Sequence, residues 1–206
     1  MKSFKSQYKY VILIVGNHEY YETKNNDRDF VTNELIKIAK EANVILLNNN
    51  SIIINRTKFI GTILWSRADK KVETKLNDFQ HMFKCVEEYN IEFEKCFDWL
   101  KDELNNSSKY LNDNAILHDY DNIVVITHHL PTEELAHQKF KDHEYGSAFH
   151  TNILNELNLS NVKYWFCGHS HEYMTNGNNT MKFILNPVGY PNELRVTKIS
   201  SQIYTI

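Results

Sequence analysis

Cysteine is scarce in this sequence: only three occur in 206 residues, and they are widely separated, at Cys85, Cys96 and Cys167. An odd number at such spacing predicts neither a zinc knuckle nor a disulfide framework. A free cysteine usually behaves as a small, buried apolar residue. We therefore expect reduced, mostly buried thiols in a cytoplasmic protein.

Long hydrophobic runs are also missing. No segment approaches the roughly 20 consecutive apolar residues that cross a bilayer as a helix. The run from Tyr10 to Val15 is too short for the core of a signal peptide, and Gly-Asn-His follows it instead of small cleavage-site residues. We expect no membrane partner.

No charge of one sign dominates, because 23 basic residues face 26 acidic ones and the net charge is -3. A strong field that would steer the protein toward nucleic acid or acidic membranes is thus excluded. We do not expect binding to a nucleic-acid scaffold, although a nucleotide-sized substrate is compatible with this charge. The length and the 42% hydrophobic content fit one domain over residues 1–206 and leave the oligomeric state open.

What the chain does contain is an alternation of short apolar runs and helical patterns, which predicts an α/β layered domain. The expected strands cover residues 10–15, 44–47, 51–54, 58–64, 123–127, 162–167 and 182–185. Helices are expected at 29–43, 83–105 and 147–157, and a closing hairpin at 195–204. The first strand is apolar throughout, which is typical of a strand buried on both faces.

Three of these strands are each followed directly by a polar cluster. In open α/β sheets, ligands bind in the crevice at the carboxyl ends of the strands. Clusters far apart in the sequence can therefore meet at one site. The three clusters are Gly16-Asn17-His18-Glu19, His128-His129 and Gly168-His169-Ser170-His171.

Imidazoles and an amide carbonyl form a ligand set suited to Zn, Mn, Fe or Co and poor for Ca or Mg. Taken alone, the His-x-His pair and the His-His pair also fit exposed or capping histidines. Asn and His are poor strand residues, so Gly-Asn-His-Glu at a strand end calls for another reason. The three clusters together favour a shared metal site over packing.

The order Gly-Asn-His-Glu, His, Gly-His-x-His resembles the second half of the signature of the calcineurin-like metallophosphoesterases. The likeness continues through segments such as Asn77-Asp78-Phe79 and Asn186-Pro187-Val188-Gly189-Tyr190. It implies a four-layered α/β/β/α sandwich that hydrolyses a phosphomonoester or phosphodiester, here a small-molecule phosphate ester, by metal-activated hydroxide. The cofactor implied is a divalent transition metal (Mn, Fe, Zn or Co), with two ions in the complete family site.

The resemblance also implies roles for individual residues. One metal would be held by Asn17, His128 and His169, and the other by His171. His18 would be the catalytic acid that protonates the leaving-group oxygen, and His129 would face the substrate.

The sequence departs from the family at its start, where the family carries an Asp-x-His and a Gly-Asp-x-x-Asp motif before Gly-Asn-His-Glu. Only fifteen residues precede Gly16, and none is Asp, Glu or His. We therefore expect a domain truncated to the C-terminal three quarters of the family domain, without its N-terminal strands. A neutral ligand set leaves the charge of a metal uncompensated, so we expect one tightly bound ion or fewer.

Two alternatives remain open. The first is a degenerate, non-catalytic protein that keeps the fold for binding or scaffolding. The second is a simple histidine-rich zinc module, which the placement of the clusters at strand ends disfavours.

Overall fold

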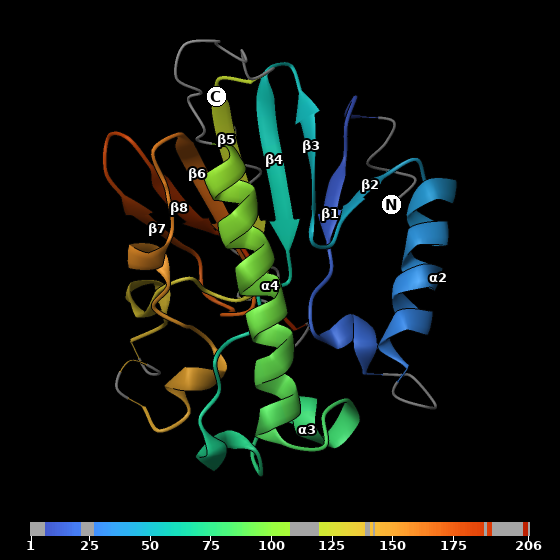
Figure 1. The fold of residues 1–206 in the computed structure, drawn as a ribbon, viewed down its shortest axis with the longest axis vertical. Helices are drawn as coiled ribbons and strands as arrows, with labels where there is room; N and C mark the ends of the chain where they lie inside the picture. The colour runs from blue at the N-terminus through green and yellow to red at the C-terminus, as the bar shows by residue number, and fades with distance from the viewer. Residues whose placement is uncertain are drawn as a thin grey trace.

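The computed structural model describes residues 7–21, 27–107, 120–138, 141, 143–187, 189–190 and 204–205. It is a mixed α/β structure with a central six-stranded sheet flanked by helices (Figure 1), so the predicted fold class is confirmed. A separate parallel pair is formed by β1 (Ile12–Ile14) and β2 (Ile45–Leu47).

The large sheet has the strand order β3-β4-β5-β6-β8-β7. Four neighbouring strands, β4, β5, β6 and β8, run parallel, so their carboxyl ends share one edge, whereas β3 and β7 are antiparallel edge strands. The bounds are β3 (Asn50–Ile54), β4 (Thr57–Thr62), β5 (Asn122–Thr127), β6 (Val162–Cys167), β7 (Met174–Gly177) and β8 (Lys182–Leu185).

The two sheets and two helices form four layers. Side chains alternate across a strand, and Lys58 of β4 forms a 2.8 Å ion pair with Glu103 of helix α4 (Val86–Ser107). On the other face of β4, a Cβ on Gly61 would collide with Leu47 of β2. Helix α2 (Arg28–Glu41) contacts β2 in turn. The order of layers is therefore α2, the β1–β2 pair, the six-stranded sheet and α4.

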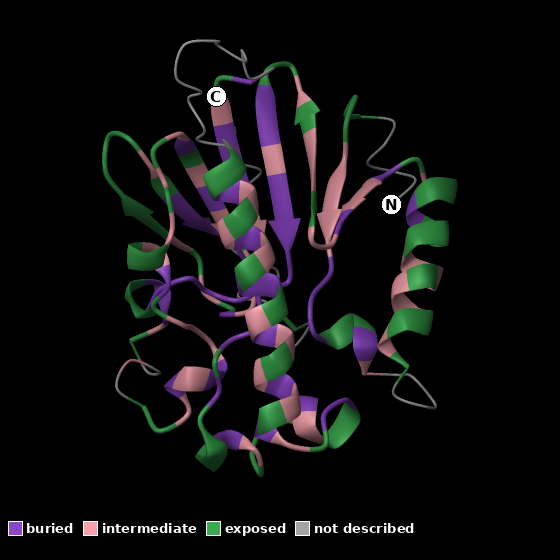
Figure 2. Ribbon diagram, in the orientation of Figure 1, coloured by how far each residue is buried: buried purple, intermediate pink, exposed green. Residues whose placement is uncertain are grey.

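Helix α4 crosses the large sheet in front of β5 and β6 and buries one apolar stripe (Figure 2). The buried residues recur every three or four positions, the period of an amphipathic helix. They are Val86, Tyr89, Phe93, Cys96, Phe97, Leu100 and Leu104. Burial of this stripe holds the sheet and the helix together. All three cysteines are unpaired, with Cys96 and Cys167 buried and Cys85 half-buried.

Short helices complete the connections at the carboxyl edge of the sheet. An α-helix, α3, spans Asn77–His81 and precedes α4. The 3₁₀ turns are η1 (His18–Tyr20), η2 (Lys70–Val72), η3 (Glu133–Leu135), η4 (Gly146–Ala148) and η5 (Leu154–Glu156). Within the part of the chain that the structure describes, no helix is both long and apolar enough to cross a membrane.

The helix predicted at 147–157 is wrong. That stretch contains only the turns η4 and η5, joined by extended chain. The reason is a tertiary pairing: Leu130 N donates to Phe149 O, and Thr151 N and Ile153 N donate to Leu130 O and Pro131 O. These backbone hydrogen bonds replace those of a helix.

Other differences are smaller. Strand β1 is only half-buried, because it pairs with β2 in a small sheet rather than lying in the middle of the large one. Neither β7 nor α3 was predicted, since Met174–Gly177 is mostly exposed and Asn77–His81 makes little more than one turn. The hairpin predicted at 195–204 lies outside the described residues except for Tyr204.

Candidate metal centre

The ends of β1, β5 and β6 bring three side chains together. His128 Nε2 lies 2.9 Å from Asn17 Oδ1 and 3.1 Å from His169 Nδ1. The three residues are separated by up to 152 positions, 169 minus 17, yet Asn17 Oδ1 and His169 Nδ1 both lie next to His128 Nε2. Ligand atoms bound at roughly 2.0–2.2 Å from one ion lie about 3 Å apart, so these separations suit a shared ion.

Two glycines make room for the His128 ring. A Cβ on Gly16 would lie 2.9 Å from Cε1 of His128, closer than side-chain atoms approach, and one on Gly168 would lie 3.4 Å from its Nδ1. The Gly168 amide also donates to the His128 carbonyl at 3.1 Å. The glycines that open two of the clusters are thus needed for the close approach of the strand ends.

His169 adopts a left-handed backbone conformation, with φ at 59°. Residues other than glycine seldom do so, although His, Asn and Asp tolerate it better than most. Such strain costs on the order of 1–3 kcal/mol and tends to collect at functional sites. Here it turns the imidazole toward His128 directly after the end of β6.

Removal from water keeps these imidazoles neutral. Burial, reinforced by the charges of His18 and His171, lowers the pKa of His128 to about 4. Burial and the neighbouring histidines also lower the pKa of His169 well below its ordinary value. Neutral imidazoles have free lone pairs near pH 7, the state in which histidine binds a metal.

Two ligand atoms face the same ring nitrogen of His128. His128 Nε2 carries either a proton or a lone pair, so it cannot donate to Asn17 Oδ1 while also accepting from His169. A cation at the shared point would instead be met by lone pairs from all three residues. The donor set thus fits a divalent transition metal.

The resemblance implies that His129 faces the substrate. His129 is fully buried, its ring centroid is 4.1 Å from that of His169, and its Nε2 lies 3.4 Å from the Tyr89 hydroxyl. Its Nδ1 is buried without a hydrogen-bond partner. One nitrogen from each of His128, His129 and His169 lies within 4.8 Å of the others, so the three imidazoles together could also hold a metal.

His18 and His171 flank the cluster on its exposed side. The Tyr190 hydroxyl lies 3.0 Å from His18 Nε2, and the Tyr190 ring packs edge-on against His171 with centroids 4.7 Å apart. Both histidines are close enough to influence the pKa values of His128 and His169. The neighbouring Glu19 carboxylate accepts a hydrogen bond from the Gly16 amide at 2.8 Å.

Sequence reasoning missed Asp78. Its carboxylate accepts hydrogen bonds from Asn17 Nδ2 at 3.1 Å and from the Tyr21 hydroxyl at 3.0 Å. Burial raises the pKa of Asp78, and the hydrogen bonds from Asn17 and Tyr21 oppose that rise. The only signal was its place in Asn77-Asp78-Phe79, where an acidic residue on a short helix reads as an ordinary exposed one.

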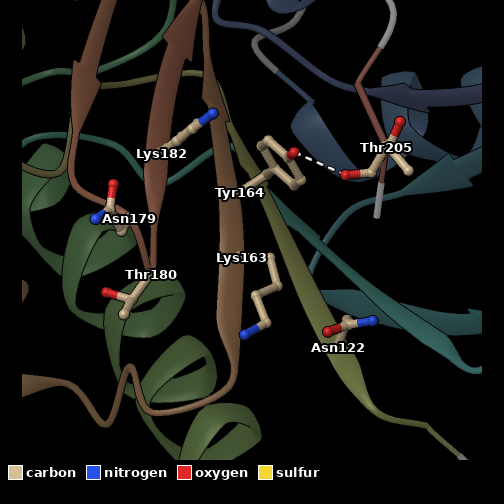
Figure 3. A pocket seen from close by; sticks show the side chains of 7 residues that line it. All are labelled: Asn122, Lys163, Tyr164, Asn179, Thr180, Lys182 and Thr205. Carbon is tan, nitrogen blue, oxygen red and sulfur yellow. Dashed lines mark hydrogen bonds between the residues drawn. The ribbon is translucent and has the colours of Figure 1, made fainter.

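A separate cavity of about 190 Å³ lies at the opposite, amino-terminal ends of β5, β6 and β8 (Figure 3). Lys163 and Lys182 line it, but Figure 3 shows their ammonium groups pointing in different directions. The Tyr164 hydroxyl donates to Thr205 O at 2.8 Å. The histidine cluster, with its converging ligand atoms, is therefore the stronger candidate site.

The buried histidines predict acid sensitivity of the metal-free protein. Between about pH 6.5 and 4 the unfolded chain binds a proton at His128 that the folded chain does not, so the free energy of unfolding should fall as the pH drops through this range. We expect a loss of roughly 3 kcal/mol from His128 alone. Urea unfolding in EDTA at pH 7.5 and pH 4.5 measures this loss of unfolding free energy. The His128→Asn variant should lose less stability than the unaltered chain between the two pH values. An equally steep loss in that variant would contradict the assignment.

Comparisons with known proteins give the family of the chain. A model of the calcineurin-like phosphoesterase family matches residues 1–173 of the chain. An uncharacterized protein of Acanthamoeba polyphaga mimivirus is 25% identical over 210 residues, which cover 90% of this chain and 70% of that protein.

One solved structure shows the same fold. The chain resembles phosphopantetheinyl hydrolase (PptH) of Mycobacterium tuberculosis with a TM-score of 0.63 and 17% identity, over 96% of this chain and 75% of that one. A putative 5'-nucleotidase of Staphylococcus aureus gives a TM-score of 0.44 and 14% identity, over 89% of this chain and 33% of that one. The first likeness confirms the fold that the resemblance implied.

Proposed function

The chain belongs to the calcineurin-like phosphoesterase family, and from this we propose that it hydrolyses small phosphate esters, mono- or diesters, with a divalent transition metal held by its histidine cluster. The observation that carries the proposal is the position of Asn17 Oδ1 and His169 Nδ1, which lie 2.9 Å and 3.1 Å from His128 Nε2. A family match over residues 1–173 supports the class of reaction.

In the proposed site, Asn17, His128 and His169 hold one ion, with His171 beside a second position. When bound, such an ion polarises a phosphoryl oxygen and activates water for attack at phosphorus. The neutral state of His128 and His169 keeps their lone pairs available for binding. His129, buried beneath His169, supports that ring from behind, and its proposed contact with substrate would require access that its burial opposes.

His18 is proposed as the acid that protonates the leaving-group oxygen. It is exposed at the rim of the cluster, within reach of a substrate, and adjacent in sequence to the ligand Asn17. Its Nε2 lies 3.0 Å from the Tyr190 hydroxyl, which can orient the ring. A proton on the departing oxygen avoids the release of an unstable alkoxide.

A non-catalytic binding role is the second candidate, and one observation favours it. Among the described residues, no carboxylate joins the group of His128, His129 and His169, so the charge of an ion there is not neutralised by a direct ligand. Uncompensated charge in a protected site weakens binding, especially of a second ion.

Metal content and activity together test the proposal. After dialysis against metal-free buffer, we expect at most one equivalent of Mn²⁺, Zn²⁺ or Co²⁺ by elemental analysis, because three neutral ligands hold one position and only His171 serves the other. We expect slow hydrolysis of nitrophenyl phosphate esters with added Mn²⁺ that EDTA abolishes. One bound ion with no turnover would support the binding role instead, and two retained ions would contradict the ligand assignment.

A further inference from the structure

A buried chain of hydrogen bonds lies behind Asn17, on the side away from the histidines. Asn17 is 2% exposed and Asp78 is 4% exposed. Asn17 Nδ2 donates to the Tyr21 hydroxyl at 2.9 Å and to Asp78 Oδ1 at 3.1 Å, and the Tyr21 hydroxyl donates to the same Oδ1 at 3.0 Å. The three polar groups form a closed triangle.

The direction of every bond in this triangle follows from the carboxylate. An ionised Asp78 carboxylate only accepts hydrogen bonds, so the Tyr21 hydroxyl donates its hydrogen bond to Asp78. The Tyr21 oxygen can then only accept a hydrogen bond from Asn17. The Asn17 group that faces both oxygens must then be the NH₂, with its two donors. The carbonyl oxygen is forced to the other side, where it lies 2.9 Å from His128 Nε2.

The opposite orientation of the amide would be costly. A flipped Asn17 would bring its carbonyl oxygen against the Asp78 carboxylate and the Tyr21 oxygen, leaving buried acceptors without donors. It would also present an NH₂ group to the histidines, and an amide nitrogen with two protons offers no lone pair to a cation. Asp78 thereby selects the only orientation that can bind a metal.

Asp78 is itself firmly placed. Its backbone carbonyl accepts from Met82 N at 2.8 Å and Phe83 N at 3.0 Å, at the junction that ends α3. The Tyr21 ring is fixed between His18, with centroids 4.3 Å apart, and His81, stacked at 4.8 Å. A rigid acceptor can impose an orientation that a mobile one could not.

We propose that Asp78 is a positioning residue that locks the Asn17 amide with its carbonyl oxygen toward the metal position, and that its carboxylate supplies charge compensation from behind a neutral ligand. The inference rests on the proposed metal site. Partners of metal ligands in other proteins typically contribute 10–100-fold to affinity. Asp78 would act at that level without touching the ion or the substrate.

Co²⁺ is the probe that tests this, because its visible absorption reports both binding and ligand geometry. We expect Asp78→Ala to weaken Co²⁺ binding by about 10–100-fold and to alter the spectrum. Asp78→Asn keeps an acceptor but can also present its NH₂, so its affinity should fall between Asp78→Ala and the unaltered chain. Asp121→Ala, which removes an exposed partner of Arg56, is the control and should bind as the unaltered chain does.

Thermal unfolding of the metal-free variants separates positioning from collapse of the fold. Co²⁺ affinity equal to that of the unaltered chain in folded Asp78→Ala, or in Asp78→Asn if the alanine variant does not fold, would overturn the proposal. If the unaltered chain binds Co²⁺ but hydrolyses no ester, the proposed hydrolysis fails and the role of Asp78 is still decided by affinity. If it binds no Co²⁺, both fail.

Discussion

Replacing His169 with glycine should lower the affinity for Co²⁺ by more than roughly 100-fold and reduce phosphate-ester hydrolysis to the background rate, while the protein stays folded. His169 is proposed as a direct ligand, and loss of a direct ligand should exceed the 10–100-fold effect of a residue behind one. Its Nδ1 lies 3.1 Å from His128 Nε2, a separation that suits the binding of one ion by both side chains.

Glycine is the informative replacement because of the backbone. At φ 59° an alanine would keep the strain and lose the side chain, whereas glycine relieves the strain. Any loss of function in His169→Gly then reflects the missing imidazole. Asn55→Gly is the matched control, since Asn55 has φ 49° in the turn between β3 and β4, away from the histidines.

Co²⁺ titration, ester hydrolysis and urea unfolding should be measured on both glycine variants. Asn55→Gly should match the unaltered chain in all three. If His169→Gly retains the affinity and rate of the unaltered chain, the ligand assignment is wrong, and the metal position would have to be sought around His128 and His129, whose buried Nδ1 lacks a partner.

The location of the cluster could be predicted because it follows from strand ends. Apolar runs such as Ile123–Thr127 and Val162–Cys167 are recognisable as buried strands, and parallel strands place their carboxyl ends at one edge. Polar residues directly after those runs, His128 and His169, must then lie near one another. The structure places them with ring centroids 4.9 Å apart.

What could not be predicted depends on contacts between distant segments. Asp78 reaches Asn17 across 61 positions, from a five-residue helix that has no clear periodicity. The segment after Gly146 has a helical pattern but pairs its backbone with Leu130 and Pro131 instead. The depth of His129 beneath His169 likewise depends on how β5 packs against α4. The local sequence pattern cannot predict any of these long-range contacts.

For His18, the sequence predicts the position but not the surroundings. Its place after β1 made it a candidate from the sequence, yet its surroundings are set by the Tyr21 ring and by Tyr190, which is 172 positions away in the sequence. The ring centroids of His18 and Tyr21 are 4.3 Å apart, and the Tyr190 hydroxyl is 3.0 Å from Nε2. A side chain held on two sides is suited to deliver a proton in one direction.

His18→Gln should therefore lower kcat by about 10²–10⁴-fold for an ester with a poor leaving group, the range that a positioned general acid contributes. The loss should be much smaller for a nitrophenyl ester, because nitrophenolate departs without protonation. Co²⁺ affinity should hardly change, since His18 is not a proposed ligand, whereas a disrupted metal site would weaken binding and slow both esters alike.

Tyr190→Phe removes the hydroxyl from His18 but keeps the ring against His171, so it should reproduce the same leaving-group dependence in weaker form. Phenyl phosphate and nitrophenyl phosphate, assayed side by side with each variant, make the comparison. Equal losses for the two esters in His18→Gln would remove the acid role from His18 and point to binding of the substrate instead.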